Sequence, residues 1–233
     1  MKIGIFAYNF KHWKTQAGIQ NLCMAGYKPE VIFAADPVEL KFYQSKIRAS
    51  PKDLFLWHPK ELSDFYSIDY HVVRHNSEET ATIVKETSLD LGIILGARIL
   101  KPVAFRRFSI GVMNMHPGIL PENRGLDNLK WAIIDKKPQG VTTHLINDKI
   151  DRGQQILQEK IKIYEDDTLL DIHLRLQHLE QKLMIDSVSV LSRSSKLKTI
   201  EKGTYYKSVP PEREAKMMQM FDDYKREFKN EKS

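Results

Sequence analysis

The chain of 233 residues is long enough for one large domain, or for one domain with a small extension. Hydrophobic residues at 42% and charged residues at 28% are ordinary globular values, which argue against disorder. The net charge of +6 favours an anionic partner without choosing between phosphate-bearing substrates, nucleic acid and anionic lipid. The longest apolar runs fall far short of the ~20 residues of a membrane span. No signal peptide is evident, so we expect a cytoplasmic protein.

Short apolar segments alternate with helical patterns in the first half of the chain. Strands of this length that alternate with helices pair in parallel, so the pattern predicts a Rossmann-like α/β fold, with an open, mostly parallel sheet and helices on both faces. The region between residues 38 and 67 is expected to hold one short helix and loops. The predicted strands are 2–8, 30–35, 70–74 and 89–95, and the predicted helices are 16–25 and 77–87.

The second half continues with a strand at 110–115 that leads directly into His116. One apolar face identifies a long helix, and a last helix is predicted at 211–228. We expect a catalytic domain over 1–200 and a C-terminal helical extension over 201–233; whether the methionine-rich last helix forms a homodimer contact or packs on its own chain is open. The remaining predictions are short helices at 103–108 and 126–135, strands at 140–146 and 155–163, and the apolar face Leu169, Ile172, Leu176, Leu179 and Leu183.

An amide, an imidazole and a carboxylate are expected to meet in this half of the chain. Asn114 and His116 lie at the carboxyl end of a predicted strand, where ligands bind in open α/β sheets. Asp151 lies in the loop between the next two predicted strands. Together they supply an oxyanion donor, a proton carrier and an orienting carboxylate, which suffice for moving an acyl group between nitrogens. Each residue alone also fits a structural role in a core or a turn.

The stretch from Gly111 to Gln158 resembles the catalytic domain of the folate-dependent formyltransferases, and its loop is similar to that of the sugar N-formyltransferases. A weaker likeness to the folate-binding loop of this family runs through Gly96-Ala97-Arg98-Ile99-Leu100. The strong anchors occur in the family's order and spacing: Asn114-x-His116, Pro117-Gly118-Ile119-Leu120-Pro121 with Arg124-Gly125, Trp131-Ala132-Ile133, Gly140-Val141-Thr142-Thr143-His144, and Asp151-x-Gly153 with Ile156.

The resemblance implies formyl transfer from N10-formyltetrahydrofolate to a primary amine, with Asn114, His116 and Asp151 as the catalytic triad. No metal is expected, and the single cysteine, Cys23, permits neither an internal disulfide nor a cysteine metal site. Whether His144 is functional or structural is left open. The resemblance places the pterin of the folate among Arg98, Ile99, Leu100, Val141, Asn147 and Asp148.

The acceptor amine is predicted by comparing this sequence with the enzymes of the family that act on different amines. Too few residues follow Thr199 for the tRNA-binding domain of methionyl-tRNA formyltransferases, and the first strand lacks the glycine-rich turn of glycinamide ribonucleotide enzymes, since no glycine occurs between it and Gly18. Aromatic and basic residues stand there instead and suit a nucleobase and a diphosphate. A nucleotide-linked amino sugar is therefore the expected acceptor. The candidate acceptor-binding residues are Phe10, Lys11, His12, Trp13, Arg124 and Gly125.

Two other enzyme classes and one binding role remain open. A glycinamide ribonucleotide or methionyl-tRNA formyltransferase-like enzyme would use the same triad on another amine, and a formyltetrahydrofolate hydrolase would use water. A folate-binding protein without catalysis is the third alternative. We expect small-molecule partners, namely folate and the amine, and neither nucleic acid nor a membrane.

Overall fold

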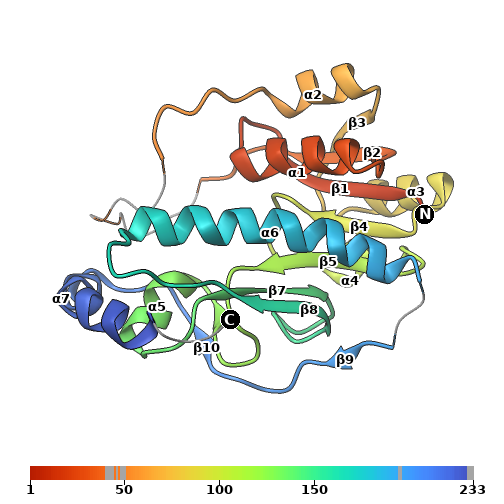
Figure 1. The fold of residues 1–233 in the computed structure, drawn as a ribbon. Coiled ribbons are helices and arrows are strands. Elements are labelled where there is room, and N and C mark those ends of the chain that lie inside the picture. The colour runs from red at the N-terminus through yellow and green to blue at the C-terminus, as the bar shows by residue number, and fades with distance from the viewer. Residues whose placement is uncertain (40–44, 46, 48–50, 194–195, 230–233) are drawn as a thin grey trace.

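The computed structural model describes residues 1–39, 45, 47, 51–193 and 196–229. Within these residues, one sheet has eight strands in the order β3-β2-β1-β4-β5-β7-β8-β9 (Figure 1). The first five strands of that order pair in parallel, and the last three are antiparallel. The strands are β1 (Ile3–Tyr8), β2 (Val31–Ala35), β3 (Asp69–Val72), β4 (Leu91–Ile94), β5 (Gly111–His116), β7 (Gly140–Leu145), β8 (Gln154–Lys160) and β9 (Lys198–Thr199).

Helices cover both faces of this sheet. The long helix α6 (Leu169–Leu191) crosses one face beside α1 (Trp13–Met24), and α3 (Glu78–Thr87) and α4 (Pro102–Phe105) pack on the other (Figure 1). The predicted Rossmann-like fold with a mostly parallel sheet is confirmed. The remaining helices are α2 (Pro59–Tyr66), α5 (Asn128–Ile134) and α7 (Pro211–Phe228).

The alternation of side chains along β1 explains why two cores form. Ile3, Ile5 and Ala7 belong to the apolar cluster beneath α1 and α6, whereas Phe6 belongs to the cluster beneath α3 and α4. Neighbouring side chains on a strand point to opposite faces, so a strand that is apolar at every position requires cover on both sides. The five apolar residues predicted to form one face of α6 are all buried.

Several element boundaries differ from the sequence-based prediction by one to three residues, and α1 and β8 are two examples. Helix α1 begins at Trp13 rather than at residue 16, so the residues expected in a loop after β1 include its first turn. His12 is the N-cap residue without a side-chain cap bond to the backbone, and this explains why no capping pattern marked the start. Strand β8 ends at Lys160, three residues before the predicted boundary.

The C-terminal segment packs on the rest of the chain. Strand β10 (Tyr205–Tyr206) pairs in parallel with β6 (Arg124–Gly125), and Met217 and Phe221 of α7 are buried in the cluster that contains α6. Of the two alternatives for the last helix, the structure shows packing on its own chain for these two side chains, while Met218 is 45% exposed. The domain boundary at residue 200 stays a prediction.

No helix among the described residues is both long enough and apolar enough to cross a membrane. The same residues contain no group of three or more histidine, cysteine, aspartate or glutamate side chains that could hold a metal ion.

Candidate functional site

Asn114 and His116 project from the sheet face that carries α3 and α4. Met113 and Met115 pack in the cluster beneath α6, and Val112 packs in the cluster on the opposite face. Because side chains alternate along a strand, Asn114 and His116 share the face of Val112. Their Cα atoms lie roughly 6–7 Å apart, the length of two residues of strand. The predicted pair therefore faces one space.

The two ring nitrogens of His116 have different surroundings. Nε2 lies 2.7 Å from the backbone carbonyl oxygen of Asn123, which also accepts from the Asn128 amide at 2.9 Å. A carbonyl oxygen only accepts hydrogen bonds, so Nε2 carries the proton of the neutral ring. Nδ1 is then the basic nitrogen, and it lies 3.6 Å from Oδ1 of Asp151. His116 is buried, and in this tautomer Nδ1 is the ring nitrogen that can accept a proton.

Asp151 lies between two histidines. Its Oδ1 is 3.6 Å from His116 Nδ1 and 3.8 Å from His144 Nε2, and its Oδ2 accepts from the Gly125 backbone N–H at 3.0 Å. Asp151 is in the left-handed region with φ of 50°, a conformation that aspartate tolerates better than most residues. The predicted meeting of Asn114, His116 and Asp151 is thus consistent with the fold, and Gly125 supports the carboxylate.

Arg124 joins the Asp151 turn to the C-terminal segment. Its guanidinium donates to the carbonyl oxygen of Ile150 at 2.6 Å and to that of Gly203 at 3.0 Å. Gly125 has φ of 100°, and a Cβ there would lie 2.1 Å from the carbonyl oxygen of Tyr206. The pairing of β6 with β10 therefore requires glycine at this position. Of the two residues predicted to bind the acceptor, Gly125 donates to the Asp151 carboxylate and Arg124 binds the backbone next to it at Ile150.

His144 is a buried neighbour of the triad. It pairs with Asn114 in the β5–β7 register and shares its face. Its Nδ1 donates to the Leu145 carbonyl oxygen at 3.3 Å, and its Nε2 has no hydrogen-bond partner among the residues that the structure describes. Burial lowers the pKa of His144 to about 4, against the attraction of Asp151. A neutral His144 therefore turns an acceptor nitrogen toward Asp151.

Because His144 is buried, we expect the free energy of unfolding to depend on pH. The pKa of His144 falls from 6.5 in the unfolded chain to about 4 in the fold, so the unfolded state binds more protons within that window. Stability is expected to be fully present above the unfolded pKa and to be lost as the pH falls toward 4. Urea unfolding midpoints between about pH 4 and 7 measure this, and His144→Asn is expected to flatten the dependence.

Two comparisons control for the other histidines. Burial also lowers the pKa of His12 to about 4, so His12→Asn separates its share from that of His144. His178 is exposed on α6, and His178→Asn serves as the matched control. Identical pH profiles for the wild type and His144→Asn would contradict the prediction.

The residues predicted to hold the pterin fall into three groups. Ile99 is 67% exposed, and its loop is braced by Asn76, whose side chain accepts from Lys101 N–H at 2.7 Å and donates to Ile99 O at 3.0 Å. Asn147 and Asp148 lie in the exposed turn before Asp151, where Asp148 pairs with Arg106 at 2.8 Å. The braced loop and the turn stay candidates for the folate site.

The other predicted pterin residues lie elsewhere. Val141 is buried beneath α6, in the cluster of Ile172 and Leu176, on the sheet face opposite the triad. Its side chain cannot form a wall of the predicted slot, because Val141 alternates with Thr142 on β7. Leu100 is buried in the core with α3 and α4, and Arg98 lines a separate cavity.

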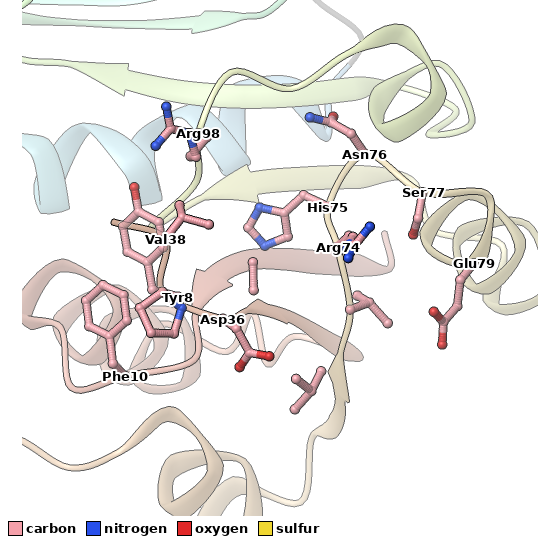
Figure 2. A pocket seen from close by; sticks show the side chains of 14 residues that line it. Tyr8, Phe10, Asp36, Val38, Arg74, His75, Asn76, Ser77, Glu79 and Arg98 are labelled. Carbon is pink, nitrogen blue, oxygen red and sulfur yellow. The ribbon is translucent and has the colours of Figure 1, made fainter. Parts of the chain in front are cut away.

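The aromatic and basic residues after β1 separate in space. Phe10 stacks on Tyr8 with ring centroids 4.9 Å apart, and both line the same cavity as Arg98 (Figure 2). Trp13 instead lines a groove between α1 and α6, and Lys11 is exposed. The rings of His12 and Tyr8 pack edge to face, with their centroids 5.4 Å apart. The structure therefore does not bring Trp13 together with Phe10.

Sequence reasoning missed the contacts that several residues make around His116. The sequence placed Asn128 in a predicted helix and gave it no other role. In the structure its amide donates to the Asn123 carbonyl oxygen, which also accepts the hydrogen bond from His116 Nε2. Lys14 Nζ donates to the Met115 carbonyl oxygen at 3.2 Å and pairs with Glu180 of α6 at 3.0 Å. Lys14 and Glu180 line a cavity of about 490 Å³ beside Pro117. Glu180 is buried next to Leu179 at the edge of the apolar face of α6, and because the apolar pattern of that face is unbroken, no sequence signal marked Glu180.

Known proteins of one family are similar to this chain. A family model described as formyl transferase matches residues 34–188. The methionyl-tRNA formyltransferase of Flavobacterium psychrophilum is 30% identical over 180 residues, which are 75% of this chain and 53% of that protein. The chain thus spans about half the length of the curated relatives it matches.

Solved structures show the same fold at low sequence identity. A sugar N-formyltransferase from Shewanella has a TM-score of 0.60 and 23% identity, covering 88% of this chain and 76% of its own. The phosphoribosylglycinamide formyltransferase of Streptococcus pneumoniae has a TM-score of 0.61 and 20% identity, covering 82% and 98%. Because the family model matches well over half of the residues and includes the strand with Asn114 and His116, the chain belongs to the formyl transferase family.

Proposed function

We propose that this chain transfers a formyl group from N10-formyltetrahydrofolate to a primary amine, and that the amine belongs to a nucleotide-linked amino sugar. The placement of Asp151 Oδ1 beside His116 Nδ1, on the face that Asn114 shares, carries the proposal. Membership of the formyl transferase family supports the reaction type. The three side chains supply a hydrogen-bond donor, a base and an acceptor for its proton.

The surroundings of the triad fit a folate. A flat heterocycle requires an apolar contact and nearby backbone groups, and the loop after β4 offers the exposed side chain of Ile99 on a backbone that Asn76 braces. When bound, the folate supplies the formyl carbon whose oxygen gains negative charge during the transfer. Ile99, Asn147 and Asp148 are the residues that we assign to holding it.

Each member of the triad has one task in this proposal. The Asn114 amide donates to the oxygen that gains charge, a contact worth about 2.7–4 kcal/mol in comparable sites. His116 Nδ1 takes the proton of the attacking amine, because Nε2 is held by the Asn123 carbonyl, and it returns this proton to N10 of the folate as the bond between N10 and the formyl carbon breaks. Asp151 stabilises the protonated ring, and Gly125 N–H keeps its second oxygen in place. No nucleophilic side chain is needed.

The sugar acceptor is supported by the loop and by the neighbourhood of the first strand. The loop from Pro117 to Gly125 resembles that of sugar N-formyltransferases, and one such enzyme is among the proteins with this fold. The segment after β1 has no glycine-rich turn that could bind a phosphate. Instead, the aromatic ring of Phe10 lines a cavity there. An aromatic wall suits a nucleobase.

The test is a comparison of acceptors with the purified chain and formyltetrahydrofolate. We expect turnover with a nucleoside diphosphate-linked 4-amino-4,6-dideoxyhexose. The turnover is measured as consumption of the formyl donor and as the mass of the formylated product. Turnover only with glycinamide ribonucleotide or methionyl-tRNA would contradict the sugar acceptor. Formate release at the same rate without any amine would identify a hydrolase. A chain that leaves the donor intact under all conditions would contradict formyl transfer itself.

A further inference from the structure

A cavity of about 950 Å³ lies at the carboxyl ends of β1, β2 and β3, outside the triad. Figure 2 shows the rings of Tyr8 and Phe10 together on one side of it, Arg74 on the other side and Asp36 between them. Val72, which is 52% exposed, adds apolar surface to its wall. None of these side chains has a task in the triad.

The aromatic wall of the cavity is flat and held in place. The rings of Tyr8 and Phe10 are nearly parallel, at 8° with centroids 4.9 Å apart, and the Tyr8 hydroxyl donates to the Ala97 carbonyl oxygen at 3.1 Å. Both residues are only partly buried, so part of the stack stays accessible. A fixed aromatic surface of this kind binds planar heterocycles by stacking, whichever base they carry.

A carboxylate is positioned beside this wall at the end of β2. Asn9 donates to Asp36 Oδ1 at 2.6 Å, and the Tyr70 hydroxyl in turn donates to Asn9 Oδ1 at 2.6 Å. The two bonds orient an exposed side chain that would otherwise be free to rotate. In open α/β folds that bind nucleotides, an acidic residue at this place accepts hydrogen bonds from ribose hydroxyls.

Two exposed arginines supply positive charge. Arg74 and Arg98 both line the cavity, and neither has a carboxylate within ion-pair distance among the described residues. Guanidinium groups bind phosphate oxygens through paired, charge-assisted hydrogen bonds. Besides Asp36, Glu79 is the other acidic side chain that lines the cavity, and in Figure 2 it lies below Ser77, across the view from the aromatic rings.

We propose that this cavity binds the nucleoside diphosphate part of the acceptor, with the base on Phe10 and Tyr8, the ribose on Asp36 and the diphosphate at the arginines. The inference rests on the proposed function and assigns it a binding site. In the sheet order, β1 is two strand spacings from β5, which is about 10 Å. Arg98 follows β4, the strand between them, and so lies on the path of a diphosphate toward His116.

Direct binding tests the site without any turnover. UDP, dTDP and GDP are titrated calorimetrically into the full chain and into Phe10→Ala and Arg98→Ala. At least one nucleotide is expected to bind, with each substitution raising Kd by about 10-fold or more. Arg107, exposed after α4 and outside the cavity lining, gives the matched control Arg107→Ala, which is expected to bind as the wild type. Circular dichroism and thermal midpoints verify that each variant folds.

The substitution Asp36→Asn separates the ribose contact from the phosphate contact. It is expected to weaken nucleoside diphosphate binding without weakening the binding of inorganic pyrophosphate, which has no ribose. Equal weakening of both would overturn the role of Asp36 and with it the assigned orientation of the ligand.

The results distinguish this inference from the proposed function. If the chain formylates a nucleotide-linked sugar with a KM unchanged by Phe10→Ala and Arg98→Ala, the cavity is not the nucleotide site, while the proposed function stands. If it formylates an amine but binds no nucleoside diphosphate, the inference is likewise overturned. If a nucleotide binds as expected but no linked sugar is formylated, the site is supported and the proposed acceptor fails.

Discussion

Replacing His116 by alanine is expected to lower kcat for formyl transfer by about 10²- to 10⁴-fold, the usual contribution of a general acid or base. The ring is the group that can take the amine's proton at this point, through Nδ1, because Nε2 donates to the Asn123 carbonyl. The alanine variant removes the base and leaves Asp151 without the partner whose charge it stabilises. Initial rates of donor consumption with the accepted amine measure the effect.

A second substitution separates chemistry from folding. His116 is 4% exposed and supports the loop that contains Asn123, so His116→Ala also changes packing. Gln in its place retains a donor for the Asn123 carbonyl without a base, and we expect the same loss of kcat with a thermal midpoint nearer to the wild type. His178→Ala, on the exposed side of α6, is the matched control. Near-normal rates in both His116 variants would contradict the assigned role.

The positions of Asn114, His116 and Asp151 could be predicted from the sequence because these residues lie in short, recognisable segments, while their role as a catalytic triad stays a prediction. Asn114 and His116 are two residues apart on one strand, and a strand pattern alone places them on one face. The position of Asp151 could be predicted because it lies in the loop between two strands that the sequence pattern identifies. The side chain of Val141 faces away from His144, as the same alternation rule predicts, because Val141 is adjacent to Thr142. It is therefore not a wall of the predicted slot, and a contact of the pterin with the Val141 backbone stays a prediction.

The contacts that hold the triad could not be predicted, because they join distant segments through backbone atoms. The Asn123 carbonyl on His116 carries no side-chain signature. Strand β6 has two residues and pairs with β10 some eighty residues later, so no periodic pattern marks either. Arg124, a residue of β6, donates hydrogen bonds to the carbonyl oxygens of both Ile150 and Gly203. The predicted C-terminal extension is therefore part of the support of Asp151.

Asn114 carries the second large expected effect. If its amide donates to the oxygen that gains charge, Asn114→Ala is expected to lower kcat by about 10²- to 10³-fold, with KM for the folate little changed. The residue is partly exposed and lies opposite His144 in the β5–β7 register, so its removal leaves the core intact. The loss comes from an interaction made mainly in the transition state, which a rate measurement under saturating donor isolates.

The substitution Asn114→Asp distinguishes this role from packing. Aspartate matches asparagine in shape, so a purely structural role would be preserved, but its carboxylate has no donor and repels the developing negative charge. It would also add a second carboxylate to the site that holds Asp151. We therefore expect Asn114→Asp to be slower than Asn114→Ala, although it is the smaller change in volume. Asn21→Asp, on the partly buried side of α1, is the control. A rate for Asn114→Asp above that of the alanine variant would show that Asn114 fills space and does not stabilise charge.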